Sequence, residues 1–275
     1  MTNDKLTLVL GGTGKTGRRV AGLLEERGLP VRIGSRSADP SFDWDAPETW
    51  PTALDGVAAV YVAFYPDLSV PGAPETISAF TTAAVDAGVE RIVLLTARGE
   101  KQAQECERIV LGADIDATVV RASWFFQNFS ESEMAPRIVR GRVVLPVGDV
   151  PEPFLDAGDI AEVAVLALTE DGHAGKVHEL TGTRTLTWEE AVAEIASALG
   201  KEIDYVRCSP EEFAAGLEAE GFPPEVAGLV TYLYTDLMDG RNTAMTDDLA
   251  RLLGRAPRDF SDFARDAVAA GTWKE

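Results

Sequence analysis

Short apolar runs rich in β-branched residues recur between residues 6 and 180. They begin at Leu6, Val31, Ala58, Arg91 and Ala117, and a further candidate run, KVHEL, begins at Lys176. The first five runs are apolar almost throughout, unlike the alternating pattern of a strand with one exposed face. This pattern predicts a parallel sheet that is covered on both faces.

Segments with helical spacing separate these runs. Their apolar residues recur at intervals of three and four at Val20, Leu23 and Leu24, at Ile77, Phe80, Ala84 and Val85, and at Ala103, Cys106, Ile109 and Val110. Further helices are expected after Asp159 and Thr187, and beyond residue 185 the pattern is mainly helical. Alternation of strand and helix predicts βαβ units, and therefore a Rossmann-like, doubly wound α/β fold.

Two parts of the chain are expected from this change of pattern. Residues 1–150, completed by residues 156–182, are predicted to form a Rossmann domain. Residues 183–275 are predicted to form a small, mainly helical C-terminal lobe that binds substrate, with interruptions at Gly221 and Gly254.

A glycine-rich turn, VLGGTGKTGRRV, joins the first predicted strand to the first helix. We expect Gly11 to permit the tight turn, Gly14 to let the backbone approach a pyrophosphate, and Gly17 to let the helix pack on the strand. GKT also ends a Walker A loop, but that loop needs a glycine five residues before Gly14, where this chain has Val9. A dinucleotide site is the favoured interpretation, and a turn that serves packing alone is the alternative.

The end of the second predicted strand bears on the choice of cofactor. An NAD site usually carries an acidic residue there, whereas this chain has Ser35, Arg36 and Ser37. A guanidinium can bind the 2′-phosphate of NADP, so NADPH/NADP+ is the predicted cofactor, with a solvated surface arginine as the alternative. The remaining cofactor contacts are predicted at Thr13, Lys15, Thr16, Ala63, Phe64, Thr96, Ala97, Arg98 and Ser123.

Composition and charge exclude several other functions. The chain has 45 acidic and 25 basic residues, and a net charge of -20 would repel a nucleic acid or an anionic membrane. The two cysteines are too few for a disulfide framework or a cysteine-based metal site, and no metal site is predicted. The first apolar run is too short for a signal peptide or a membrane span, so we expect a cytoplasmic protein.

Several segments together resemble the NmrA-like atypical short-chain dehydrogenases, particularly members akin to festuclavine dehydrogenases. The segments that carry this resemblance are GGTGKTGRRV, SRS, PGA, RIVLLTARGE, TVVRASWFFQNF, EPFLDAGDIAEVAV and LLGRAPRDF, and they span nearly the whole chain. The resemblance implies an NADP-binding Rossmann domain and a cleft closed by a C-terminal lobe.

The chain departs from the related typical enzymes at the catalytic pair. Typical short-chain dehydrogenases use Tyr-x-x-x-Lys, in which the tyrosine protonates the developing alkoxide. If Glu107 corresponds to the glutamate that often follows this pair, the tyrosine position falls on Gly99 and the lysine position on Ala103. No tyrosine lies between Tyr65 and Tyr205, so the usual acid is missing.

Two interpretations follow from the missing acid. A reductase could act on an electrophile that needs little proton donation, such as a quinone or an iminium, since general acid catalysis typically supplies about 10²- to 10⁴-fold. An NADP(H)-sensing regulator would keep the nucleotide only as a signal. The resemblance to bacterial-looking members of this family implies a polyketide pathway, so we favour a quinone reductase of secondary metabolism, of the polyketide antibiotic type, together with a partner enzyme that consumes the reduced product. An iminium or ketone reductase of alkaloid type is a further alternative.

The segment after the run at Ala117 offers candidate substrate contacts. Trp124, Phe125 and Phe129 could stack on a flat aromatic substrate and Asn128 could donate to its oxygen, although core packing explains any single ring equally well. The other predicted substrate contacts are Tyr65, Phe154 and Tyr232. No catalytic residue is assigned, and the candidates are Trp124, Asn128, Lys101 and Gln104. We expect structural roles for His173, His178 and Cys106.

Overall fold

The computed structural model describes residues 5–274, which fall into two units. Unit 1 contains the chain up to Ala122 together with Ala157–Leu180 and Asp248–Arg255. Unit 2 contains Ser123–Asp156, Thr181–Asp247 and the chain from Ala256 onward. This division differs from the predicted boundary at residue 150, because the chain enters unit 2 directly after the strand that ends at Ala122 and later returns to unit 1.

Unit 1 is built on a six-stranded parallel sheet with the strand order β2-β1-β3-β4-β5-β7. Its strands are β1 (Leu6–Leu10), β2 (Val31–Gly34), β3 (Val57–Val62), β4 (Arg91–Ala97), β5 (Asp116–Ala122) and β7 (Lys176–Leu180). The chain moves outward from β1 to β2 and then crosses back to β3, so the order reverses between β1 and β3. Such a reversal is where open α/β sheets bind ligands, at the carboxyl ends of the strands.

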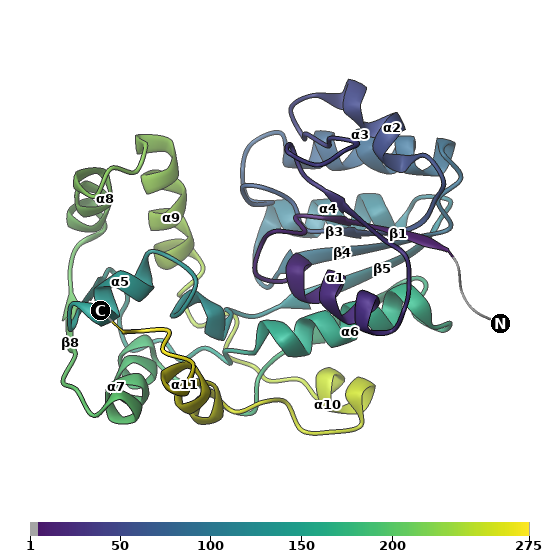
Figure 1. Cartoon of the computed structure of the whole chain (residues 1–275). Helices are drawn as coiled ribbons and strands as arrows, with labels where there is room; N and C mark the ends of the chain where they lie inside the picture. The colour runs from purple at the N-terminus through teal and green to yellow at the C-terminus, as the bar shows by residue number, and fades with distance from the viewer. Residues whose placement is uncertain (1–4, 275) are drawn as a thin grey trace. The chain divides into compact units, whose positions relative to one another are not determined.

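Helices cover both faces of this sheet (Figure 1). One face carries α2 (Trp50–Leu54), α3 (Ala73–Asp86) and α4 (Lys101–Leu111), and the other carries α1 (Gly17–Glu26) and α6 (Ala157–Thr169). A short helix, α10 (Asp248–Leu253), packs on β7 and α6. The predicted doubly wound Rossmann-like fold is therefore confirmed.

The buried side chains of unit 1 follow the predicted periods. Leu8 and Leu10 of β1 and Val60 and Val62 of β3 alternate onto the face that packs against α3, whose Phe80 is fully buried. Burial of such strands on both faces explains why their sequences are apolar almost throughout.

Unit 2 combines a small sheet with helices. Strands β6 (Arg142–Leu145) and β8 (Asp204–Arg207) pair in parallel, and no expectation from the sequence included either strand. The helices are α5 (Met134–Val139), α7 (Trp188–Leu199), α8 (Pro210–Ala219), α9 (Pro224–Asp236) and α11 (Phe260–Ala269). Helix α7 begins where predicted, because Thr187 and Glu190 form a reciprocal capping box at its first turn.

Candidate functional site

The glycine turn between β1 and α1 has the geometry that its sequence predicts. Gly11 has a φ of 68°, and a Cβ atom there would lie 2.9 Å from the carbonyl oxygen of Ala63. A Cβ atom on Gly17 would lie 2.2 Å from the carbonyl oxygen of Gly11, so only glycine allows α1 to start this close to the turn. The Gly14 N–H donates to the same Gly11 oxygen at 2.8 Å, which closes the turn.

The start of helix α1 suits an anionic group. The helix begins at Gly17, has no acidic residue in its first turn and carries no side-chain cap on its first N–H groups. Basic side chains flank it at Lys15, Arg18 and Arg19, and Arg19 donates to the Lys15 carbonyl oxygen at 2.6 Å. The helix dipole and these cations together favour a diphosphate at this turn.

Arg36 lies two residues beyond the end of β2 and is exposed. Beside it, the hydroxyl groups of Ser35 and Ser37 lie 3.4 Å apart. Among residues 5–274, Arg36 has no ion-pair or hydrogen-bond partner, so its guanidinium is available to a ligand phosphate.

An aromatic wall that sequence reasoning missed lies beside the predicted cofactor residue Phe64. The ring centroids of Trp44 and Phe64 are 4.8 Å apart, and both side chains are partly buried. Behind them, Trp44 packs edge-on against Phe42 and Phe80, which are buried. The sequence held a signal for this wall in the aromatic residues of SFDWDAPETW. Because this segment is not itself a strand-like apolar run, no role was predicted for it.

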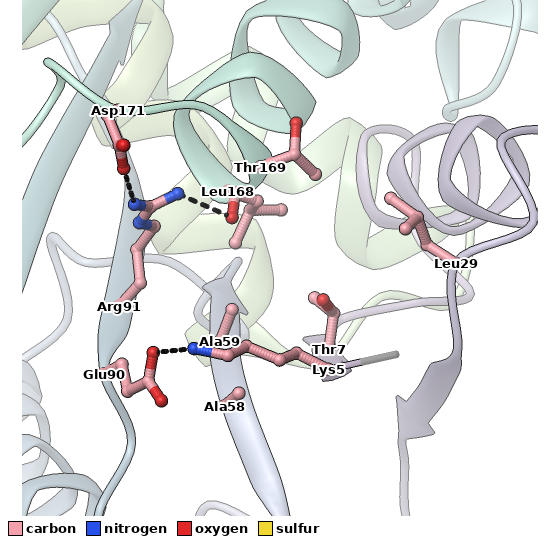
Figure 2. A pocket seen from close by; sticks show the side chains of 10 residues that line it. All are labelled: Lys5, Thr7, Leu29, Ala58, Ala59, Glu90, Arg91, Leu168, Thr169 and Asp171. Carbon is pink, nitrogen blue, oxygen red and sulfur yellow. Dashed lines mark hydrogen bonds and ion pairs between the residues drawn. The ribbon is translucent and has the colours of Figure 1, made fainter. Parts of the chain in front are cut away.

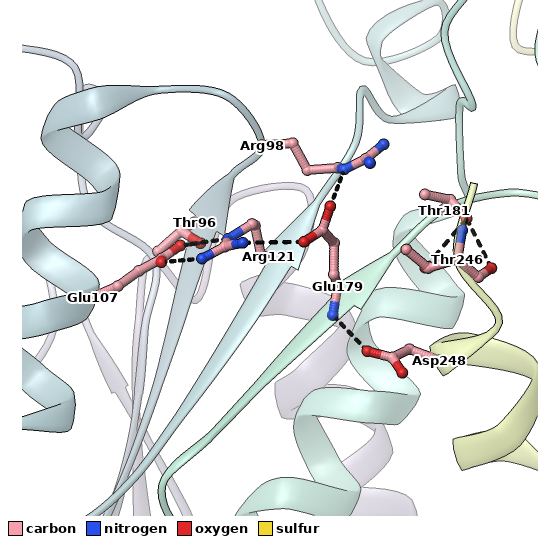
Figure 3. A network of polar contacts seen from close by, with 8 residues as sticks. All are labelled: Thr96, Arg98, Glu107, Arg121, Glu179, Thr181, Thr246 and Asp248. Atoms are coloured by element: carbon pink, nitrogen blue, oxygen red, sulfur yellow. Dashed lines mark hydrogen bonds and ion pairs between the residues drawn. The ribbon is translucent and has the colours of Figure 1, made fainter. Parts of the chain in front are cut away.

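A network of paired charges joins the carboxyl ends of β4, β5 and β7 (Figure 3). Arg121 of β5 binds Glu107 of α4 with two nitrogens, one of them Nε at 2.9 Å from Oε1. The same Glu107 carboxylate accepts from the Thr96 hydroxyl at 2.7 Å, and hydrogen bonding to Glu107 raises the pKa of Arg121. Arg121 also donates to Glu179 of β7, at 3.0 Å. Glu107 is only 4% exposed, so this charge is held inside the protein.

Arg98 extends the network from the end of β4. Its Nε donates to Glu179 Oε1 at 2.8 Å, and the Glu179 backbone N–H donates to Asp248 of α10 at 2.9 Å. The structure thus brings the predicted cofactor residues Thr96 and Arg98 to one edge of the sheet, each bound to a buried or half-buried carboxylate. Sequence reasoning did not predict these pairings, although a lone arginine inside the apolar run ATVVRA was a visible signal.

If Glu107 marks the catalytic pair of the typical enzymes, neither of the two positions can present a side chain to a substrate. Gly99 has a φ of 75°, which favours glycine, and lies in the loop before α4. Ala103 is 1% exposed and faces the core. The candidate donors Lys101 and Gln104 are exposed on α4, where surface solvation accounts for them as well as a catalytic role does.

The candidate substrate residues have different surroundings. Tyr65 follows β3 in unit 1 and is 69% exposed. In unit 2, Trp124 is half-buried and stacks on Tyr234 with centroids 5.0 Å apart, and Tyr232 is exposed. Phe125 and Asn128 are half-buried, and the nearby Ser123, a predicted cofactor contact, is buried.

The surroundings of Phe129 and Phe154 favour a packing role over contact with a substrate. They are 0% and 2% exposed, and both rings contact Trp188 and Phe260 in the aromatic core of unit 2. Packing accounts for the positions of these two rings, so they are left out of the proposed substrate surface.

The surroundings of His173, His178 and Cys106 suit a structural role. His173 Nδ1 lies 2.9 Å from His178 Nε2, and Cys106 is fully buried, which raises the pKa of its thiol to about 12. Within residues 5–274, no three side chains of the His, Cys, Asp or Glu type are grouped to hold a metal ion. Over the same residues, every helix is too short or too polar to cross a membrane.

The parallel sheet, its order reversal beside the glycine turn and the uncapped start of α1 define a Rossmann-fold protein of the dinucleotide-binding class. No protein-family model matches the sequence. Agroclavine dehydrogenase of Claviceps fusiformis is 32% identical to this chain, over 94% of the chain and 96% of that protein.

Solved structures show the same fold. An NADPH-dependent quinone oxidoreductase of Escherichia coli, complexed with NADPH, is similar with a TM-score of 0.77 and 22% identity, over 96% of this chain and 99% of its own. NmrA, a negative transcriptional regulator, is similar with a TM-score of 0.71 and 16% identity, over 98% and 97%.

The similarity to agroclavine dehydrogenase shows the family. This chain belongs to the NmrA-like atypical short-chain dehydrogenases and is an oxidoreductase of the NAD(P)H-dependent type. The predictions of family and of enzymatic class are therefore confirmed.

Proposed function

We propose that this protein is an NADPH-dependent reductase that transfers hydride to a quinone-like aromatic substrate. The observation that carries the proposal is the missing catalytic pair: where alignment on Glu107 puts the tyrosine and lysine of the typical enzymes, Gly99 and Ala103 supply no proton donor. A substrate that accepts hydride without an enzymatic acid fits this arrangement, because reduction of a quinone yields a delocalised phenolate that takes its proton from water. The quinone reductase of similar fold supports this choice.

The cofactor assignment rests on unit 1. When bound, NADPH supplies the hydride. Gly11, Gly14 and Gly17 with the start of α1 would hold its diphosphate, and Arg36 would bind its 2′-phosphate. The partly exposed faces of Trp44 and Phe64 would line the adenine.

The charge network would fix the side chains at the carboxyl edge of the sheet around the nicotinamide ring of the cofactor. The Thr96 hydroxyl proton is directed to Glu107, so this side chain offers a lone pair rather than a proton to its other neighbours. Glu107 accepts from two side chains and stays fixed. These residues would therefore position the cofactor rather than exchange protons with the substrate. Trp124, Phe125, Asn128, Tyr65 and Tyr232 remain the predicted substrate contacts.

A substrate panel tests the proposal directly. Loss of NADPH absorbance should be followed with benzoquinones and naphthoquinones, with cyclic iminium ions and with small ketones. We expect the quinones to be turned over and the ketones to be inert, because ketone reduction needs a proton at the developing alkoxide. Faster turnover of iminium ions would replace the quinone with the alkaloid-type alternative, which the name of agroclavine dehydrogenase favours. NADPH binding without turnover of any class would favour a regulator, as the NmrA structure does.

The Arg36→Glu variant tests the cofactor assignment. Loss of the charge-assisted hydrogen bonds should raise the KM for NADPH by roughly tenfold to a hundredfold and change the KM for NADH little. Arg27→Glu is the matched control, since Arg27 is an exposed arginine at the far end of α1. Equal KM values for NADPH in Arg36→Glu and Arg27→Glu would refute the role of Arg36.

The place of the reaction in secondary metabolism and the consuming partner enzyme remain predictions.

A further inference from the structure

The cavity at the amino ends of β1, β3 and β4 in unit 1 is lined by charges that already have partners (Figure 2). Lys5 pairs with Glu90, and Arg91 donates to Asp171 at 3.0 Å. These four charges satisfy one another, so they need no ligand. A polar group that lacks such a partner lies in unit 2, on helix α9.

The Tyr234 side chain of α9 ends in a hydroxyl group that has no hydrogen-bond partner within residues 5–274. Tyr234 is 3% exposed, and its hydroxyl oxygen is not enclosed, unlike the indole nitrogen of Trp188. Buried polar side chains nearly always have a hydrogen-bond partner. The Tyr234 hydroxyl is therefore available to an acceptor on a ligand.

Three aromatic side chains hold the ring of Tyr234 in place. Trp124 stacks on it with centroids 5.0 Å apart and an interplanar angle of 27°, and Trp188 contacts it at 5.0 Å and 64°. Phe213 packs edge-on against the same ring at 5.5 Å. A ring packed in this way keeps its hydroxyl in one position, and a donor that is already oriented loses little entropy when it binds.

The rest of α9 favours an apolar ligand. Residues 226–235 are ten consecutive residues without a charge, whereas 25% of the whole chain is charged. In this helix only Ala227 and Tyr234 are buried, and Tyr232 is exposed. Trp124, which stacks on Tyr234, is also only partly buried. An apolar surface with a few oriented polar groups is typical of a small-molecule site.

The surroundings of Tyr234 keep its hydroxyl protonated. Burial raises the pKa of Tyr234 well above its ordinary value, and the Glu133 carboxylate raises it further, although Arg137 acts in the opposite direction. The hydroxyl therefore acts as a hydrogen-bond donor rather than as an acid. A ligand with an acceptor oxygen, such as a carbonyl oxygen, satisfies this donor.

We propose that the Tyr234 hydroxyl donates a hydrogen bond to a carbonyl oxygen of the aromatic substrate, whose rings pack against Trp124. This inference rests on the proposed reduction of a quinone and adds a residue that orients the substrate. Hydride transfer converts the quinone to the hydroquinone anion and NADPH to NADP+, and the anion then takes a proton from water. Negative charge develops on an oxygen during this step, so the hydrogen bond from Tyr234 becomes charge-assisted and stronger.

Tyr234→Phe removes the hydroxyl and keeps the ring. With 1,4-naphthoquinone and saturating NADPH, kcat/KM should fall about tenfold to hundredfold, because the lost bond involves a developing charge. The loss should be larger in kcat than in KM, since the bond is strongest once charge has begun to develop. Tyr205→Phe is the matched control and should leave kcat/KM unchanged, because the Tyr205 hydroxyl donates to the Val147 carbonyl oxygen at 3.2 Å. An unchanged kcat/KM in Tyr234→Phe would overturn the proposal.

Urea unfolding separates this role from a structural one. Removal of a hydroxyl that has no internal partner should leave the midpoint of unfolding unchanged or raise it, whereas Tyr205→Phe should lower the midpoint. If Tyr234→Phe lowered the midpoint as much as Tyr205→Phe does, the Tyr234 hydroxyl would be stabilising the fold, and its role in substrate binding would be refuted.

Calorimetry distinguishes a failure of this inference from a failure of the proposed function. Titration of 1,4-naphthoquinone into the full chain with bound NADP+ measures binding alone, because no hydride is present. The quinone should bind about threefold to tenfold more weakly to Tyr234→Phe than to the parent protein, since a neutral hydrogen bond is lost. Weaker binding by the variant, without quinone turnover by the parent protein, would count against the reductase and support the contact. Quinone turnover with equal binding and equal kcat/KM in both proteins would exclude the contact and leave the reductase standing.

Discussion

The two edges of the unit 1 sheet carry their charges in different ways. At the carboxyl edge, Glu107 is 4% exposed and shares two contacts with Arg121. At the amino edge, Lys5 and Glu90 are 54% and 60% exposed. A buried carboxylate cannot exchange its partner for water without a large free-energy cost, whereas an exposed one can. The charges of the first edge are therefore fixed in their pairs, whereas those of the second are open to water.

Arg121→Met should give the largest effect, because it strands the Glu107 carboxylate inside the protein. Breaking a buried pair on one side costs about 3–5 kcal/mol of unfolding free energy. Urea unfolding followed by circular dichroism should show this loss. The double variant Arg121→Met with Glu107→Leu should recover most of it, since an apolar pair of similar volume leaves no unpaired charge.

Lys5→Met is the matched control at the opposite edge. It breaks an exposed pair, so the loss of unfolding free energy should stay below about 1 kcal/mol. If Arg121→Met cost no more than Lys5→Met, burial would not distinguish the two edges, and the argument for a fixed carboxyl edge would fail.

The same contrast explains what could be predicted from the sequence. The unit 1 strands were visible because each carries its signal in consecutive residues, and β4 and β7 begin at the predicted Arg91 and Lys176. Strands β6 and β8 are each four residues long and lie far apart in the sequence. A local hydrophobic pattern therefore does not reveal that they pair. Their existence depends on tertiary contacts in unit 2.

The residues of the candidate site also fall into two groups, those that a local motif predicts and those that only the fold brings together. The roles of Gly11 and Gly17 in the turn follow from a local motif, and the structure shows the close contacts that require glycine at both positions. The binding of Glu107 to Arg121 joins residues on different elements, and only the fold reveals that Glu107 is buried while the nearby Glu105 is half-buried. The contact of Trp44 with Phe64 was missed because Trp44 lies between β2 and α2, whereas Phe64 follows β3.

His178 provides a smaller test of whether burial decides the cost of a charge. It lies on β7, is 3% exposed and contacts His173 rather than a carboxylate. Burial, together with the nearby His173, lowers the pKa of His178 from 6.5 to about 4. The unfolded chain therefore takes up a proton between these pH values while the folded chain does not, so stability is complete above pH 6.5 and falls as the pH is lowered towards 4.

This linkage should cost about 2 kcal/mol of unfolding free energy between pH 7 and pH 5, from about 1.4 kcal/mol for each unit of pKa difference. Urea unfolding at the two pH values measures it. His178→Gln removes the titrating group, so its unfolding free energy should fall by about 2 kcal/mol less over the same interval, even if the variant is less stable at pH 7. His173→Gln should retain most of the dependence, because burial of His178 is the larger cause of the lowered pKa. Equal pH dependence in the parent protein and in His178→Gln would show that this buried imidazole takes up its proton without cost, and burial alone would then be too weak a criterion to separate the two edges of the sheet.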